Sequence, residues 1–286
     1  LEVLDGSAFN VSANAFHLSS DTSLGRSYMI AISPIVGSPT ITNVNVRNDS
    51  QFEVSNNTLV SAVATLQSTM HVHFIEISAP KWYIANSSAR RIERNYFVAK
   101  TTFLNAANIM YLSKNDDITL VNSLDSISDN TVHVLSASRN MYAMRMHQAK
   151  WKLYDGSNVE IKGNDLSIEI ENAPPTLNYV MGVSLWQCTA NTEGTSASVV
   201  DISDNKVYVN MLDAPTLMIA TGLGIDLTSF LRYNSSLLLL RNTIDMTAKA
   251  QTSIIGLSFL ASSIELSQGS RLIIEDLTAT IVGYGG

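Results

Sequence analysis

Apolar and polar residues alternate along most of this chain in short runs, a period of two that predicts β-strands. Many of the runs belong to one phrase, S-x-h-x-h-x-x-N-x-h-x-h, in which h is apolar and an asparagine separates two strand-like halves. The phrase aligns eight times, beginning at Ser7, Ser50, Ser88, Ser123, Ser157, Ser198, Ser235 and Ser270. Such self-similarity is the signature of a repeat architecture.

The asparagine of the phrase recurs at nearly constant intervals. It is present in seven copies, as Asn14, Asn57, Asn95, Asn130, Asn164, Asn205 and Asn242, and Leu277 replaces it in the eighth. The successive intervals are 43, 38, 35, 34, 41, 37 and 35 residues, a variation typical of loop insertions. Each period also contains further apolar runs, such as "HVHFIEI" at 71–77, and no helical stripe with a period of 3.6.

These features predict an all-β fold, a parallel β-helix solenoid of about eight coils of about 37 residues, each with three short strands. We expect a single solenoid domain over residues 1–286. Stacked coils would place the asparagines in register, where their amides can bond from coil to coil as a ladder. Because asparagine tolerates a positive φ, we expect the asparagine itself to make the sharp turn, in a structural and not a catalytic role.

The alternation also predicts which residues face the core. One inward row reads Phe9, Phe52, Arg90, Asp125, Val159, Val200, Leu237 and Leu272. Its two charged members lie on consecutive coils, and an isolated buried charge is very costly. Arg90 and Asp125 should therefore pair in the core or leave it together, and we favour the pair.

The composition argues against several classes of partner. A formal net charge of -7 and a pI near 5.2 disfavour nucleic acids and anionic membranes, which bind clustered Lys and Arg. The longest aliphatic run, "LLLL" at 237–240, is far short of the roughly 20 residues that span a bilayer, so we expect no direct membrane insertion. Cys188 is the only cysteine, which excludes an internal disulfide and a CxxC metal or redox site.

Phrases such as "SQFEVSNNTLVSA" and "NSSLLLLRNTIDM", in a chain rich in serine and asparagine, resemble the coils of the dispersed gene family surface proteins of trypanosomatids. More generally, they resemble the pectin-lyase-like β-helices. The resemblance covers nearly the whole chain through its repeat. It implies an extracellular, cell-surface or secreted protein that acts in adhesion, with host or matrix glycans or proteins as partners. No catalytic motif and no cofactor carry over from that family.

Two function classes remain, a structural or adhesive rod and a polysaccharide-cleaving or carbohydrate-binding β-helix enzyme. The enzyme needs two or three carboxylates that converge on one exposed face. The best acidic stretch is "NDD" at 115–117, and neither a "GHG" nor an "RxK" phrase accompanies it. Acids at the position before the ladder, Asp129, Asp204 and Asp276, do not fall on neighbouring coils. We therefore favour the non-catalytic rod.

Metal and sugar sites have only weak candidates. His71 and His73 share one strand face at i, i+2, but no acid or cysteine with ligand spacing accompanies them, so we expect no metal site. Trp82, Trp151 and Trp186 could form a sugar-stacking platform, although packing positions at strand ends explain them better.

Five N-x-S/T sequons occur, which is about the number that chance gives. Their asparagines are Asn10, Asn48, Asn56, Asn86 and Asn234. Asn10 points outward between two inward residues, and Asn48, Asn86 and Asn234 lie in turns before the coil serine. We expect N-glycosylation at some of these sites if the chain is secreted by a eukaryote.

The repeat begins at Ser7 and still runs at Ile281, and neither terminus offers a capping element. An open β-helix end exposes unpaired strand groups over an apolar core. We therefore expect the chain to be a segment of a longer solenoid, or to be covered at both ends by other β-helix subunits.

Overall fold

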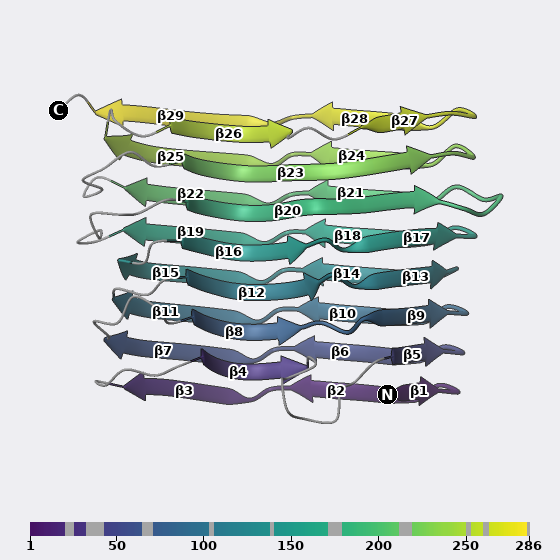
Figure 1. The fold of residues 1–286 in the computed structure, drawn as a ribbon, viewed down its shortest axis with the longest axis horizontal. Helices are drawn as coiled ribbons and strands as arrows, with labels where there is room; N and C mark the ends of the chain where they lie inside the picture. The colour runs from purple at the N-terminus through teal and green to yellow at the C-terminus, as the bar shows by residue number, and fades with distance from the viewer. Residues whose placement is uncertain are drawn as a thin grey trace.

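A computed structural model describes most of the chain. The described residues are 1–20, 26–32, 43–64, 71–102, 106–137, 140–170, 179–211, 219–249, 253–259 and 263–284. Within these ranges all regular structure is β-strand, without a helix. The strands form three parallel sheets whose members stack in register along one axis (Figure 1), which confirms the predicted parallel β-helix.

The second and third sheets each contain eight strands, one from every copy of the serine phrase. The second sheet consists of β2 (Ala8–Ser12), β6 (Gln51–Ser55), β10 (Ala89–Glu93), β14 (Leu124–Ser128), β18 (Asn158–Lys162), β21 (Val199–Ser203), β24 (Ser236–Leu240) and β28 (Arg271–Glu275). The third sheet consists of β3 (Ala15–Ser20), β7 (Thr58–Ala64), β11 (Tyr96–Thr102), β15 (Thr131–Ala137), β19 (Asp165–Ile170), β22 (Lys206–Met211), β25 (Thr243–Lys249) and β29 (Thr278–Tyr284).

The first sheet contains 13 strands, arranged as two halves of one wall. The half that follows the third sheet consists of β4 (Arg26–Ile32), β8 (His71–Ile77), β12 (Ala106–Lys114), β16 (Asn140–His147) and β26 (Ser253–Phe259). The half that precedes the second sheet consists of β1 (Glu2–Leu4), β5 (Asn43–Arg47), β9 (Lys81–Ala85), β13 (Asp117–Val121), β17 (Lys150–Tyr154) and β27 (Ile264–Leu266). Two long strands, β20 (Tyr179–Thr192) and β23 (Ile219–Leu231), run through both halves.

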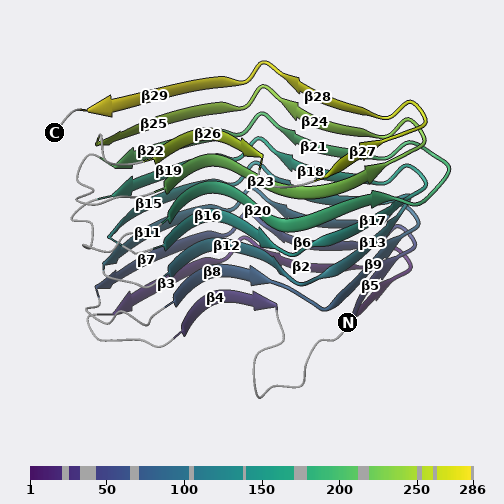
Figure 2. The same ribbon diagram turned by 45° about the horizontal axis from the view of Figure 1, so that its top comes forward.

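Each coil contributes to three parallel sheets, as predicted, but in most coils the segment in the first sheet is divided into two strands. The cause is a bend in the middle of this wall (Figure 2). Asn115 and Gln148 adopt positive φ between the two strands of their coils, and Gln187 does so inside β20. A left-handed residue turns the chain out of the pleat, so it divides most of these segments and bends the longest one.

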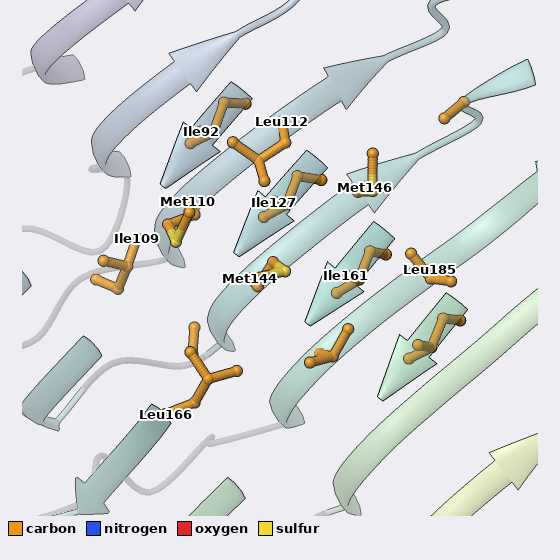
Figure 3. Packing of buried hydrophobic residues seen from close by; sticks show 14 of the residues in the cluster. Ile92, Ile109, Met110, Leu112, Ile127, Met144, Met146, Ile161, Leu166 and Leu185 are labelled. Carbon is orange, nitrogen blue, oxygen red and sulfur yellow. The ribbon is translucent and has the colours of Figure 1, made fainter. Parts of the chain in front are cut away.

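The core is built from stacked rows of aliphatic side chains. Ile92, Ile127 and Ile161 form one such row on successive strands of the second sheet (Figure 3). Leu112 and Met146 from the first sheet lie across from this row, and all five side chains are fully buried. Each burial of this kind contributes about 1.5–3 kcal/mol, so the rows supply the main force that holds the coils together.

The turn between the second and third sheets differs from the prediction that the asparagine itself adopts positive φ. The ladder asparagines do not adopt positive φ; the residue before each of them, and before Leu277 in the eighth copy, does, with φ between 52° and 66°. These residues are Ala13, Asn56, Arg94, Asp129, Gly163, Asp204, Arg241 and Asp276. The reason is that the asparagine side chain must point into the stack to reach the next coil. The preceding residue, exposed or half-buried in every copy, makes the turn instead.

Candidate functional site

The ladder asparagines bond to the coils on both sides. Oδ1 of Asn130 accepts hydrogen bonds from the backbone N–H of Asn95 at 3.1 Å and from its Nδ2 at 3.0 Å. Nδ2 of Asn130 donates to Oδ1 of Asn164 at 3.0 Å and to the backbone oxygen of Ile92 at 2.9 Å. The amide-to-amide bonds continue at every step from Asn14 to Asn242. These amides form hydrogen bonds with backbone groups at the turn, which have no partner in the sheets, so their role is structural.

The serine that opens the phrase forms a second, less complete ladder. The backbone N–H of Ser50 donates to Oγ of Ser88 at 3.1 Å, and that of Ser198 donates to Oγ of Ser235 at 3.0 Å. Both ladders therefore hold turns together, which explains why the phrase keeps these two polar residues.

Arg90 and Asp125 form a bidentate ion pair inside the solenoid. Nε of Arg90 lies 2.8 Å from Oδ1 of Asp125, and Nη2 lies 2.7 Å from Oδ2. Both side chains are 0% exposed. Nε1 of Trp151 donates a third hydrogen bond to Oδ2 of Asp125 at 2.9 Å, and the guanidinium carbon lies 4.7 Å from the centroid of the Trp82 ring. The pair is thus placed in the core, as favoured from the sequence.

A second buried carboxylate, that of Asp116, also contacts Trp82. Asp116 accepts hydrogen bonds from Oγ of Ser78 at 2.7 Å, from the backbone N–H of Ala79 at 3.0 Å and from Nε1 of Trp82 at 3.1 Å. The backbone N–H of Lys114 donates a fourth bond at 3.0 Å. Burial raises the pKa of Asp116, and the hydrogen bonds from Ser78, Ala79 and Lys114 oppose the rise. The central acid of the "NDD" stretch is therefore committed to the core and is not available at the surface.

The five sequon asparagines are all exposed. Asn48 and Asn86 lie at equivalent turn positions on neighbouring coils, where Nδ2 of Asn86 donates to Oδ1 of Asn48 at 2.8 Å. Nδ2 of Asn48 in turn donates to Oδ1 of Asp5 at 2.7 Å. The side-chain amides of Asn48 and Asn86 are thus exposed and also hydrogen-bonded to the neighbouring coil.

The outer face of the first sheet carries a group that the sequence analysis missed. The guanidinium carbon of Arg145 lies 4.4 Å from the centroid of Tyr142 and 5.7 Å from that of Tyr111, and Nη1 lies 3.5 Å from Oδ1 of Asn108. The hydroxyl of Tyr111 lies 3.4 Å from Nδ1 of His147. We call these five residues the tyrosine–arginine cluster. Their positions at i, i+3 on neighbouring strands gave no recognisable sequence signal before the register was known.

Burial sets the charge of this cluster. It raises the pKa of Tyr111 to about 12 and also raises the pKa of Tyr142. Burial, together with Arg145 and Lys114, lowers the pKa of His147. At neutral pH Arg145 therefore lies between neutral aromatic rings, and Glu76 is the register partner of Tyr111 on the neighbouring strand.

A pair of acids on the outer face of the second sheet was also missed. Glu160 in β18 and Asp201 in β21 are register partners, so their backbones lie about 4.8 Å apart. Nζ of Lys162 lies 3.8 Å from Oδ2 of Asp201. The signal for this pair in the sequence is the third position after the coil serine. It reads Asn10, Glu53, Arg91, Ser126, Glu160, Asp201, Leu238 and Ile273.

The remaining candidate residues are two histidines, three tryptophans and the single cysteine. The side chains of His71 and His73 lie outside what the structure describes, and the described residues contain no group of three His, Cys, Asp or Glu that could hold a metal ion. Trp82 and Trp151 are buried packing residues, whereas Trp186 is half-buried on another part of the first sheet. Cys188 is a buried free thiol.

Comparisons of the chain with protein-family models, with curated proteins and with solved structures find no match. The assignment to the β-helix class therefore stands on the structure itself. Within the described ranges, no helix has the length and hydropathy that a membrane crossing requires.

Proposed function

We propose that this chain is a non-catalytic rod of a cell-surface or secreted protein and that it serves in adhesion. The observation that carries the proposal is the asparagine ladder, an unbroken series of amide-to-amide bonds along the stack. A ladder of this kind fixes the spacing of successive coils, so outward side chains repeat at about 4.8 Å along a stiff support. The buried ion pair and Asp116 are likewise used for holding coils together.

The extracellular part of the proposal rests on two observations. The repeat resembles the dispersed gene family surface proteins of trypanosomatids, and all five sequon asparagines are exposed. Host or matrix glycans or proteins are the partners that such a rod would contact. The tyrosine–arginine cluster is the described surface best suited to that contact, because it combines aromatic rings with a cation.

Other β-helix coils are the second class of partner that we propose. The outermost described coil exposes apolar side chains, among them Ile274, Ile281 and Leu266. Coils of the same kind, whether from this polypeptide or from another, would bury these side chains and pair with the edge strands β28 and β29.

Glycosylation can be tested on material purified from the native source. We expect intact-mass analysis to show glycans that an N-glycosidase removes, at one or more of the five exposed sequons. Native material that carries no glycan at any of them would refute this part of the proposal.

Adhesion is tested with beads that carry the purified chain. We expect the beads to attach to cells or to extracellular matrix, and the double variant Tyr142→Ala with Arg145→Gln to attach at least about tenfold less. Tyr208→Ala is the matched control, because Tyr208 is an exposed tyrosine on the third sheet, outside the cluster. Beads that attach to no cell and to no matrix component would overturn the proposed function.

A second candidate function is cleavage of a polysaccharide, and the adjacent acids Glu160 and Asp201 are the observation that favours it. Two carboxylates about 5–5.5 Å apart can act as general acid and as base or nucleophile, and side chains of register partners on neighbouring strands can reach that separation. The test is release of reducing ends or unsaturated products from a panel of acidic and neutral polysaccharides. Cleavage that disappears in both Glu160→Gln and Asp201→Asn would establish the enzyme in place of the rod.

A further inference from the structure

The turn between the first and second sheets departs from its common form in two copies: the sixth has a longer turn, residues 193–198, without a left-handed residue, and the fourth has a shorter one. Six copies place two consecutive left-handed residues in this turn: Asp5 and Gly6, Asn48 and Asp49, Asn86 and Ser87, Asp155 and Gly156, Tyr233 and Asn234, and Gln268 and Gly269. The fourth copy has only one, Asn122. Val121 and Ala85 are register partners at the ends of their strands. Two residues lie between Ala85 and Ser88, whereas only one lies between Val121 and Ser123. The fourth turn is therefore one residue short.

The missing residue leaves a notch in the column of turns. A hollow of about 280 Å³ lies at this point, lined by residues of the third, fourth and fifth copies. In the third copy the backbone N–H of Ser87 donates to the carbonyl oxygen of Asn122 at 2.9 Å. The shortened fourth turn has no equivalent donor, and no backbone N–H of the described residues donates to the carbonyl oxygen of Asp155. Gly156, which has no side chain, keeps one side of the notch open.

Two opposite charges flank the notch. Arg91 and Glu160 occupy one row of the second sheet, with the small Ser126 between them. The backbones of Arg91 and Glu160 are two strand spacings apart, or about 9.6 Å, and their long side chains can carry the charged groups closer together over the notch. A ligand that bridges them needs an anionic and a cationic group about 4 Å apart, each making a charge-assisted hydrogen bond. That is the separation of the charged groups in an α- or β-amino acid.

The surrounding charges disfavour a simple anion. Oε2 of Glu93 lies 3.8 Å from Nη1 of Arg91, and Glu53 is the register partner of Arg91 on the other side. An anion at Arg91 would therefore meet several carboxylates. A zwitterion offsets this repulsion, because its ammonium group is attracted to Glu160 while its carboxylate faces Arg91.

The neutral groups of the notch fit the same ligand. Among the residues that the structure describes, the side-chain amides of Asn122 and Asn158 have no hydrogen-bond partner in the protein. They can donate to a carboxylate, and the carbonyl oxygen of Asp155 can accept a remaining ammonium proton. We propose that this notch binds a small zwitterion of the amino-acid class. The site is independent of the proposed adhesive function.

The test is a titration of the full chain with glycine and β-alanine, followed by saturation-transfer NMR and calorimetry. We expect both to bind, and methylamine, glycolate and 6-aminohexanoate to bind at least about tenfold more weakly. Glucose and glucuronate test the alternative of a sugar ligand. Binding of either sugar in preference to the amino acids would overturn the proposal, as would the absence of amino-acid binding.

Two variants connect binding to the notch. Inserting one glycine between Asn122 and Ser123 restores the regular turn and fills the hollow, so we expect a folded protein without amino-acid binding. Arg91→Gln should lower the affinity at least about tenfold, whereas Arg94→Gln, which changes the charge equally outside the notch, should not. If the insertion variant does not fold, the Arg91 and Arg94 variants still decide the matter. Binding that survives Arg91→Gln would contradict the assignment.

Discussion

Removing Asp125 alone should destabilise the protein more than replacing both members of the buried ion pair. Asp125→Ala leaves the guanidinium of Arg90 in a fully buried site without an anionic partner and leaves Nε1 of Trp151 without its acceptor. The neighbours of the pair in the same inward row are apolar, Phe52 on one side and Val159 on the other. The double variant Arg90→Met with Asp125→Leu therefore continues an apolar row.

The structure sets the expected magnitudes. Breaking a buried ion pair by removing one partner costs about 3–5 kcal/mol. The unpaired indole N–H adds about 1–3 kcal/mol, so Asp125→Ala should lower the free energy of unfolding by about 4–8 kcal/mol. The double variant removes both charges and should lose only the contribution of the indole, about 1–3 kcal/mol.

The assay is urea unfolding at neutral pH, followed by far-UV circular dichroism, for the unsubstituted chain, both single variants and the double variant. A loss below about 1 kcal/mol in Asp125→Ala would mean that the pair is hydrated and not buried. A double variant that is as unstable as the single variant would refute the argument that the unpaired charge causes the loss.

Four further predictions concern the ladder, a turn and two buried groups. Asn130→Ala removes bonds to three residues and should lower the free energy of unfolding by about 2–4 kcal/mol in urea. Ala13→Gly relieves a left-handed alanine and should raise that free energy by up to about 1 kcal/mol. Burial raises the pKa of the Cys188 thiol to about 12, so mass spectrometry should detect alkylation by iodoacetamide near pH 8 only after unfolding. Burial also raises the pKa of Asp116, so the folded state binds this proton more tightly, and its stabilising effect is lost as the pH rises through the folded pKa. The stability of the unsubstituted chain relative to Asp116→Asn should therefore increase as the pH falls.

Each of these four predictions has a control or a result that would contradict it. Asn10→Ala, at an exposed position, should leave stability unchanged, and an equal loss there would remove the special role of the ladder. A destabilised Ala13→Gly would contradict the strain argument. Alkylation of Cys188 in the folded protein at the rate of the unfolded chain would show that the thiol is accessible. A pH-independent difference for Asp116→Asn would show that this carboxyl titrates normally.

The ladder and the core rows could be predicted because both repeat in the sequence. Asn130 and its equivalents keep a fixed distance from the coil serine, and the alternation around them names the inward residues. The left-handed position could not be predicted, because the stack imposes that conformation on chemically unrelated residues such as Ala13 and Arg94. Local propensity carries no information when tertiary packing decides the backbone.

The buried polar network also could not be predicted from the sequence. Trp82 and Asp116 are 34 residues apart, and Asp125 and Trp151 are 26 apart. Only the stacking of coils and the position of the bend in the first sheet bring them together. The notch depends on a spacing that is visible in the sequence at Asn122, but its meaning requires the strand register.

The stacking of coils is tested most directly by distances between spin labels on one outward row of the third sheet. In the strand register, this row runs from His17 through Tyr208 and Asp245 to Thr280. With Cys188 replaced by alanine, labels at position 17 and at 208, 245 or 280 are separated by five, six or seven coils.

Pulsed electron paramagnetic resonance should give mean distances of about 24, 29 and 34 Å for these three pairs, an increase of about 4.8 Å per coil. Distances that do not increase by this step from one pair to the next would contradict the parallel in-register solenoid.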